Sequence, residues 1–132
     1  VNAITRMITF LKAMRLGGGT LARFNGMGRT EADALATVIA YDTAPDTALP
    51  PLTESRYARL ASAGTVLVAD VGLPPPLELA GQAHAGCLAF EVSSGTSLIF
   101  VNCGSPSQAH ETMQAASRAT ASHNTLCLAD RS

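Results

Sequence analysis

The stretch that decides the fold lies in the second half of the chain and reads Gly86-Cys87-Leu88-Ala89-Phe90-Glu91-Val92-Ser93-Ser94-Gly95-Thr96-Ser97-Leu98-Ile99-Phe100-Val101-Asn102. Two β-prone runs, 86–92 and 97–102, flank the polar turn 93–96, which is the pattern of a β-hairpin. Both runs carry apolar residues on both faces of the strand. We therefore expect this hairpin to be central in a sheet and covered on both sides.

A second hairpin is predicted on the N-terminal side of the first. Arg56–Leu60 and Thr65–Asp70 flank the turn Ser62-Ala63-Gly64, and the run 65–68 is strongly β-prone. The three prolines 74–76 force an extended loop between the two hairpins. Two further elements are predicted toward the C-terminus, a short helix over 111–117 and a last strand over Thr125–Ala129.

The first part of the chain has the period of helices instead. Apolar residues recur at steps of three and four from Asn2 to Met14, which predicts an amphipathic helix with Asn2 as its N-cap. A second helix is expected over 31–40, because Thr30 and Asp33 resemble a capping box.

The segment 43–54 contains Pro45, Pro50 and Pro51 and breaks both regular periods. We therefore divide the chain into a helical part over 1–42, a Pro-rich linker over 43–54 and a β part over 55–132. The expected class is an α+β fragment.

Composition limits the function. The chain has 132 residues, with 9 Lys and Arg against 10 Asp and Glu, so no basic excess is present and nucleic acid is not an expected partner. No apolar run reaches the 18 residues or more of a membrane span. Charged residues make up only 14% and apolar residues 47%, so we expect part of the surface to be buried against polypeptide outside this sequence.

The ends of the sequence agree with this expectation. The sequence starts at Val1 and stops at Ser132, directly after an apolar alternation. We expect a piece of a longer protein.

Cysteines and histidines are few enough to weigh one by one. Cys87, Cys103 and Cys127 form no CxxC pair and lie among strand-like residues, which favours small buried thiols in the reduced state. His110 is expected to be solvated. His84 and His123 both lie where a loop meets a strand, and either hydrogen-bonded structure or a metal or catalytic role is consistent with that position.

Three segments follow one another along the chain: Gln82-Ala83-His84-Ala85-Gly86-Cys87-Leu88-Ala89-Phe90-Glu91, Phe100-Val101-Asn102-Cys103-Gly104 and Arg118-Ala119-Thr120-Ala121-Ser122-His123-Asn124-Thr125-Leu126. They resemble the ordered blocks of the heparinase II/III family of bacterial polysaccharide lyases. The family shows an HxHAD-type segment, a VDPG-type segment and an R-S-T-x-x-H-N-T segment in this order. The resemblance implies an α/α toroid followed by antiparallel sheets stacked as a β-sandwich, with the end of the toroid in the helical part.

The resemblance also implies a function for the parent protein. Its expected reaction is β-elimination on an acidic, uronate-containing polysaccharide such as a glycosaminoglycan, in the periplasm or cell envelope, with the cytoplasm left open. A base removes the C5 proton and an acid protonates the leaving oxygen. The toroid supplies much of this machinery, so the fragment itself is expected to be inactive and to pack against the missing remainder of its own chain.

Two positions bear on substrate and catalysis. Gln82 stands where the family has a catalytic histidine, and it cannot exchange a proton near neutral pH. Arg118 matches the arginine of the last block, either as a substrate contact or as a cap of the preceding helix. Gln82 and Arg118 are thus the candidate substrate-binding residues, and no catalytic residue is assigned.

The family's metal positions map to His84, Asn102 and His123. Asn102 stands where the family has an aspartate, and Gly86 removes a further carboxylate. A neutral amide is a poor zinc ligand beside a carboxylate, so zinc is expected to bind weakly or not at all.

Strand register bears on the same site. With Val92 opposite Ser97, Asn102 would lie opposite Cys87, about 10 Å along the strand from His84 at roughly 3.3 Å per residue. Shared ligation would then require a bend or bulge near Gly86.

Two other interpretations of the sequence are open. A non-catalytic carbohydrate-binding or structural β-sandwich keeps the fold, and the near-neutral charge favours it, since a cleft for a polyanion is normally basic. An unrelated all-β binding module would make the matches accidental.

Overall fold

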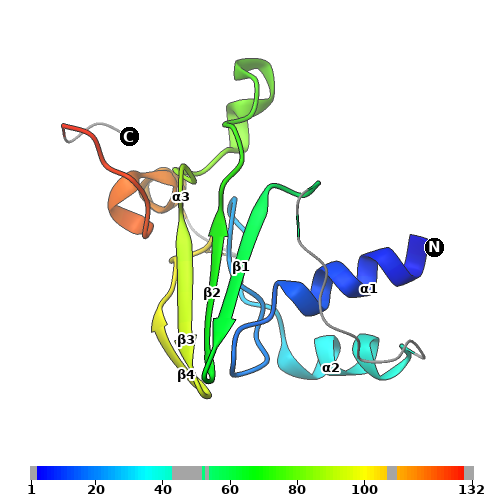
Figure 1. Cartoon of the computed structure of the whole chain (residues 1–132). Helices are drawn as coiled ribbons and strands as arrows, with labels where there is room; N and C mark the ends of the chain where they lie inside the picture. The colour runs from blue at the N-terminus through cyan, green and yellow to red at the C-terminus, as the bar shows by residue number, and fades with distance from the viewer. Residues whose placement is uncertain (1–2, 43–51, 53, 107–109, 130–132) are drawn as a thin grey trace.

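The structure is a computed structural model that describes residues 3–42, 52, 54–106 and 110–129, without the side chain of Gln82. Its elements follow in the order α1 (Ala3–Ala13), α2 (Ala32–Ala40), β1 (Tyr57–Ser62), β2 (Thr65–Asp70), the 3-10 helix η1 (Leu77–Gln82), β3 (Phe90–Ser94), β4 (Ser97–Phe100), α3 (Glu111–Arg118) and the 3-10 turn η2 (Thr120–Ser122). In Figure 1, α1 and α2 lie on one side of the sheet and α3 lies on the other. The predicted α+β class is confirmed.

The sheet consists of two hairpins placed side by side in the order β1-β2-β3-β4, with all neighbours antiparallel. β1 and β2 pair from Tyr57↔Asp70 to Ser62↔Thr65, and the turn between them is Ala63-Gly64. Both turn residues have positive φ, 48° and 80°, which is the backbone of a type I′ turn. Both predicted hairpins therefore form.

The register predicted for the second hairpin is wrong. Ser94 pairs with Ser97 across a two-residue turn, and Val92 pairs with Phe100 instead of Ser97. The register shifts between Val92 and Ser93, which leaves Ile99 as an extra residue on β4. The prediction was a four-residue turn and a bulge near Gly86. The structure instead has a two-residue turn and a bulge within the hairpin.

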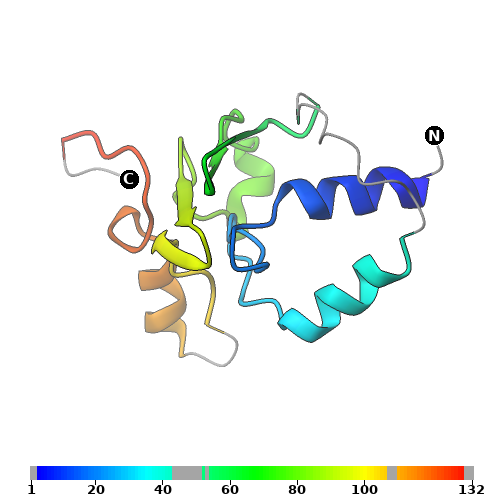
Figure 2. The same ribbon diagram turned by 60° about the horizontal axis from the view of Figure 1, so that its bottom comes forward.

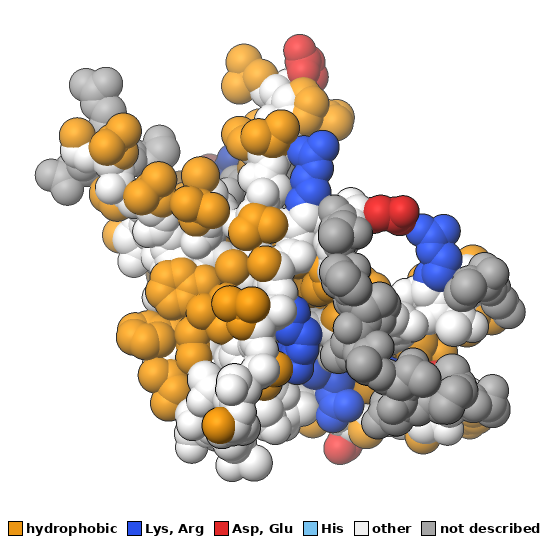
Figure 3. Space-filling model, viewed as in Figure 1, with side chains coloured by type: hydrophobic (Ala, Val, Ile, Leu, Met, Phe, Trp, Pro, Cys, Tyr) orange, Lys and Arg blue, Asp and Glu red, His pale blue; other side chains and the backbone are white. Residues whose placement is uncertain are grey.

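The hairpin is also not covered on both sides among the described residues. β3 is central, but β4 is the terminal strand of the sheet. The side chains of Leu98, Ile99 and Phe100 are exposed. Figure 3 shows hydrophobic side chains gathered over this side of the molecule. The apolar residues of β4 therefore have no packing layer within the described part of the chain.

The core lies where the helical part meets the sheet (Figure 2). Its buried members come from the end of α1, the following loop, α2 and the sheet: Met14, Leu16, Leu21, Ala22, Phe24, Leu35, Val68 and Ala89. Arg59 of β1 ties the two parts together, because its guanidinium donates to the carbonyl oxygens of Ala13 at 2.9 Å and Arg15 at 2.6 Å. These carbonyls end α1 and have no partner within the helix.

The helix predictions are correct in extent and wrong in one cap. α1 covers the predicted segment, while Asn2 lies outside the described residues. α2 begins after Glu31, which makes no side-chain cap hydrogen bond, so the capping box of Thr30 and Asp33 does not form. The helix starts too late for Thr30 to reach its first amides. Most of the predicted linker 43–54 also lies outside the described residues, and the proposed division stays a prediction.

The C-terminal segment contains the predicted helix but not the predicted strand. α3 ends at Arg118, one residue beyond the predicted end. Residues 125–129 form no strand of the sheet; Phe90 donates to the Asn124 carbonyl at 2.9 Å and Leu126 donates to the Cys87 carbonyl at 3.1 Å. Two isolated bonds do not make a ladder.

The cysteine prediction is half correct. The three thiols are free, but all three cysteines are exposed rather than buried. The physical reason is that the strands are shorter than predicted, so Cys87, Cys103 and Cys127 lie outside them. His110 is exposed, as predicted. None of the helices in the described part of the chain is both long and apolar enough to cross a membrane.

Candidate functional site

Two of the predicted site residues, His84 and His123, come together at the C-terminal end of α3. His84 follows η1 and His123 follows η2. The Nδ1 atom of His84 lies 3.2 Å from the Nε2 atom of His123, and the ring centroids are 5.3 Å apart at an angle of 80°. Both nitrogens also meet the carbonyl oxygen of Ser117, at 3.0 Å and 2.8 Å. Residues 39 positions apart thus share one helix-terminal acceptor.

The carbonyl oxygen fixes the hydrogen positions of the two rings. A carbonyl only accepts, so both rings donate to Ser117 when no metal is bound, and the contact between the two nitrogens is not itself a hydrogen bond. Burial lowers the pKa of His84, and the nearby His123 and Arg118 act in the same direction, whereas the Ser117 carbonyl opposes them. His84 is therefore neutral at neutral pH.

The same three atoms allow a test of whether a metal fits. Two ligands about 2.1 Å from a tetrahedral zinc lie roughly 3.4 Å apart, close to the 3.2 Å between the two histidine nitrogens. The pair therefore fits zinc in spacing, with the Ser117 carbonyl as a third neutral donor. Among the described residues no group of three or more His, Cys, Asp or Glu side chains is placed to hold a metal ion.

Asn102, the remaining predicted metal ligand, is buried with both ends of its amide bound to backbone. Its Nδ2 donates to the Arg23 carbonyl at 3.0 Å, and its Oδ1 accepts from the Asn124 amide at 2.9 Å. Asn102 thus contacts Asn124, the neighbour of His123, and links Arg23 of the helical part to the last of the three blocks.

Glu91 is a buried carboxyl group that the sequence analysis did not single out. It lies on β3, is fully buried, and accepts from the backbone amide of Asn102 at 2.8 Å. Burial raises its pKa, and the Asn102 amide acts in the opposite direction. Alternation on β3 could have found it, because Glu91 lies on the same face as the buried Ser93.

Arg118 holds the segment that carries the first block. Its Nε donates to the Ala83 carbonyl at 2.9 Å and its Nη2 reaches the Ala80 carbonyl at 3.4 Å. In return, Ala85 donates to the Arg118 carbonyl at 3.0 Å. Gln82 lies on η1 inside this clamped segment. The guanidinium therefore binds backbone through Nε and Nη2.

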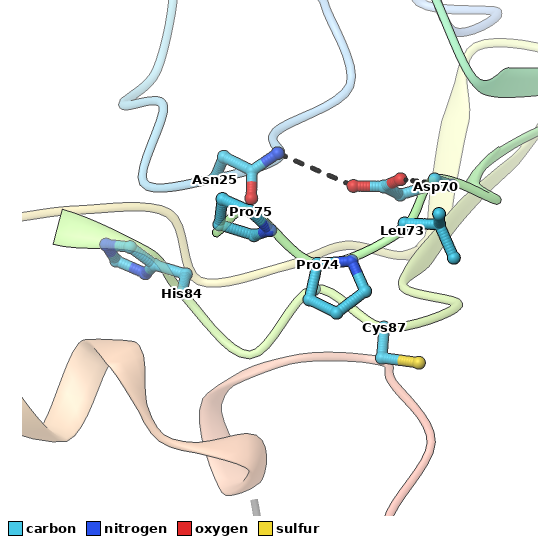
Figure 4. Close-up of a pocket in the computed structure, with 9 residues that line it drawn as sticks. Asn25, Asp70, Leu73, Pro74, Pro75, His84 and Cys87 are labelled. Atoms are coloured by element: carbon cyan, nitrogen blue, oxygen red, sulfur yellow. Dashed lines mark hydrogen bonds between the residues drawn. The ribbon is translucent and has the colours of Figure 1, made fainter. Parts of the chain in front are cut away.

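A cleft of about 80 Å³ opens on the other side of His84 (Figure 4). Its lining combines polar groups with an apolar wall: Asn25, Asp70, Gly72, Leu73, Pro74, Pro75, His84, Gly86 and Cys87. Asn25 donates to Asp70 Oδ2 at 3.4 Å and to the Tyr57 hydroxyl at 3.3 Å. Burial and the charge of Asp70 raise the pKa of Tyr57, so its hydroxyl keeps its proton.

Residues 44–132 match the family described as heparinase II/III-like, C-terminal. The chain belongs to the heparinase II/III-like family. Its identity to the FtsZ-localized protein C of Caulobacter vibrioides is 32% over 104 residues, which is 78% of this chain and 18% of that protein. The heparinase II/III-like chain thus spans less than a fifth of that relative, and no solved structure matches it.

Proposed function

We propose that this heparinase II/III-like chain belongs to a non-catalytic, carbohydrate-binding β-sandwich. The observation that carries the proposal is that Asn102, Arg118 and His123 each bind backbone through their side chains: the Asn102 amide, Arg118 Nε and His123 Nε2 are engaged in this way. A catalytic group needs free donors or acceptors directed at the reacting sugar. Here the same groups stabilise the contact between the last block and the rest of the fold.

The residues at the remaining family positions support the same proposal. Gln82 has no proton to exchange near neutral pH, and Gly86 has no side chain. The matched Caulobacter protein is named for its localization with FtsZ and not for a reaction. A location shared with FtsZ is a testable property of the protein that contains this chain.

A lyase acting by β-elimination on an acidic, uronate-containing polysaccharide is the second candidate for the whole protein. The observation in its favour is that His84 and His123 still meet at hydrogen-bonding distance, as a family site would require. In that case the groups that move protons come from outside this chain, and the chain alone is inactive. The periplasm or cell envelope is the location we propose for a lyase.

Weak zinc binding at the histidine pair is a separate proposal. His84, His123 and the Ser117 carbonyl would hold it, and it would supply a positive charge to a sugar carboxylate. All three donors are neutral, so nothing in the donor set compensates the charge of the ion. We expect zinc to bind orders of magnitude more weakly than at a site with an aspartate or cysteinate ligand.

Exposed apolar side chains support the proposal that the chain packs against further polypeptide of its own protein. On β4, the side chains of Leu98, Ile99 and Phe100 are exposed. Contiguous exposed apolar patches are typical of interaction surfaces rather than of the free surface of a monomer.

The test uses the longer protein that contains this chain. It is incubated with heparin-like, alginate-like and bacterial capsular polysaccharides, while the absorbance of the unsaturated product is followed. In parallel, affinity electrophoresis through gels that contain the same polysaccharides or neutral ones measures binding. Retardation without product supports the proposal, and product formation would establish the lyase instead.

A further inference from the structure

The cleft beside His84 is the feature whose polar groups are least used by the fold. Asp70 and Asn25 lie at its rim from two segments far apart in the sequence, the end of β2 and the loop after α1. Figure 4 shows the two side chains facing each other above the proline wall. None of the predicted site residues other than His84 and Gly86 belongs to the lining.

The groups that remain free in this cleft are hydrogen-bond acceptors. The Asp70 carboxylate has about four lone-pair positions. Among the described residues it accepts only from the Gly72 amide at 2.9 Å and, over a long 3.4 Å, from Asn25. Both bonds of the Asn25 amide nitrogen point to Asp70 and Tyr57, and its oxygen has no partner among the described residues. That oxygen faces Gly86, where a Cβ atom would lie 3.3 Å away.

Charge at the cleft selects among sugars. Asp70 is the one carboxylate of the described lining, and the lining has no Lys or Arg. Arg56 lies next to the lining with its aliphatic stem beside Gly72, and in the described part of the chain it forms no ion pair with Asp70. Arg118 donates to the Ala80 and Ala83 carbonyls. A uronate carboxylate beside Asp70 would meet a like charge.

The wall opposite these acceptors is apolar. Leu73, Pro74 and Pro75 form it, and Leu73 is 77% exposed. A sugar ring presents hydroxyl donors at its edge and C–H groups on its face, so acceptors beside an apolar wall suit its two kinds of surface.

We infer that the Asn25 and Asp70 cleft binds a neutral or amino sugar unit through hydroxyl or ammonium donors, and not a uronate. The inference rests on the proposed carbohydrate binding and narrows it to a ligand class that differs from the acidic substrate implied by the family resemblance. A hydroxyl donates to the carboxylate as a charge-assisted hydrogen bond, and an ammonium adds an opposite charge.

The experiment titrates the ¹⁵N-labelled 132-residue chain with three probes at millimolar concentration: cellotetraose, chitosan tetrasaccharide and tetragalacturonate. The readouts are the backbone amides of Gly72 and Gly86 and the side-chain amide of Asn25. Cellotetraose or chitosan tetrasaccharide should shift all three signals, and tetragalacturonate should leave them unchanged. A larger effect of chitosan tetrasaccharide identifies the amine as the preferred donor.

Variants test whether the probes bind at this cleft or at another surface of the chain. Asp70→Asn keeps the shape and an acceptor for Gly72, and it should weaken chitosan tetrasaccharide about ten- to hundredfold and cellotetraose less. Asn25→Gly removes the amide without strain, since Asn25 has a φ of 51°. Glu78→Gln, an exposed carboxylate of η1 outside the lining, is the matched charge control and should change nothing.

The outcomes distinguish the inference from the proposed function. If tetragalacturonate shifts the cleft signals and Arg56→Gln weakens it, the inference is overturned while carbohydrate binding stands. Shifts confined to other residues lead to the same conclusion. If none of the three probes shifts any signal, both the inference and the carbohydrate-binding proposal fail.

Discussion

Two polar clusters lie on either side of His84, and they differ in how fully the fold uses them. On the inner side, the Ser117 carbonyl, His123 Nε2, the Asn102 amide and Glu91 Oε1 bind one another or backbone. Glu91 Oε2 is buried there without a hydrogen-bond partner among the described residues. On the outer side, Asp70 and Asn25 keep acceptors that the described residues leave free and that lie at the surface. The comparison teaches that matching a family's motif positions does not by itself identify the groups available for a ligand. The inner cluster has the motif residues, and the outer cluster has the accessible acceptors.

The largest effect is expected from removing the centre of the inner cluster. Asn102→Ala leaves the Arg23 carbonyl and the Asn124 amide without their partner in a buried place, and we expect a loss of about 2 to 4 kcal/mol of unfolding free energy. Urea denaturation followed by circular dichroism measures it. Asn25→Gly in the outer cluster is the control and should cost less than about 1 kcal/mol. Equal losses in both variants would remove the difference between the clusters.

A smaller effect is expected at Gly26, which lies against His84, the residue between the two clusters. Gly26 has a φ of 78°, and a Cβ atom there would lie 2.5 Å from His84 Nε2. Gly26→Ala should therefore push the His84 ring away from Ser117 and cost about 1 to 3 kcal/mol in strain. Thermal unfolding gives the stability, and histidine ring signals in NMR report the displacement. An unmoved His84 ring would contradict the assigned packing.

The charge of Glu91 gives a smaller effect that depends on pH. Burial raises the pKa of Glu91 in the folded state above that of a glutamate in the unfolded chain, so the folded state holds more protons than the unfolded state in the pH window between the two. Stability should therefore fall as pH rises through this window, by at most about 1.4 kcal/mol per pH unit from this group. Glu91→Gln keeps an acceptor for Asn102 and should flatten this slope in urea titrations from pH 4 to pH 8. An unchanged slope would show that Glu91 does not carry it.

The smallest effect is expected from zinc. Because the donors at His84, His123 and Ser117 are neutral, micromolar zinc should leave the site largely empty and raise the unfolding free energy by less than about 1 kcal/mol. The same addition to His123→Ala should then differ little from wild type, and metal analysis of the purified protein should find well under one zinc per chain. One zinc per chain in wild type that is lost in His123→Ala would show that the inner cluster is a metal site. It would contradict the conclusion that the fold leaves ligand-binding groups mainly in the outer cluster.

Much of the secondary structure was predictable because it follows from local period. Both hairpins, the two N-terminal helices and α3 form where apolar spacing placed them. The register of the second hairpin was not predictable from the same pattern. Ser93-Ser94-Gly95-Thr96 accommodates a turn of two or four residues, and the pairing of Ser94 with Ser97 is a choice between nearly equal local energies.

The candidate site was predictable in part. The motif order placed His84 and His123 in one site, and the structure joins them. The sequence offered no signal for the carbonyl of Ser117, because a backbone atom has no residue type. The pairing of Asn25 with Asp70 was equally hidden, since it depends on how the helical part packs on the sheet.

By itself, the sequence determined the order of helices and strands, the heparinase II/III-like family and the presence of Gln82, Gly86 and Asn102, none of which carries an ionisable side chain. These properties are carried by residue type and spacing, which persist whatever the packing. Only the tertiary structure decided which polar groups are already used. Hydrogen bonding saturates each donor and acceptor, so the availability of Arg118, Asn102 or Asp70 depends on neighbours that are distant in the chain.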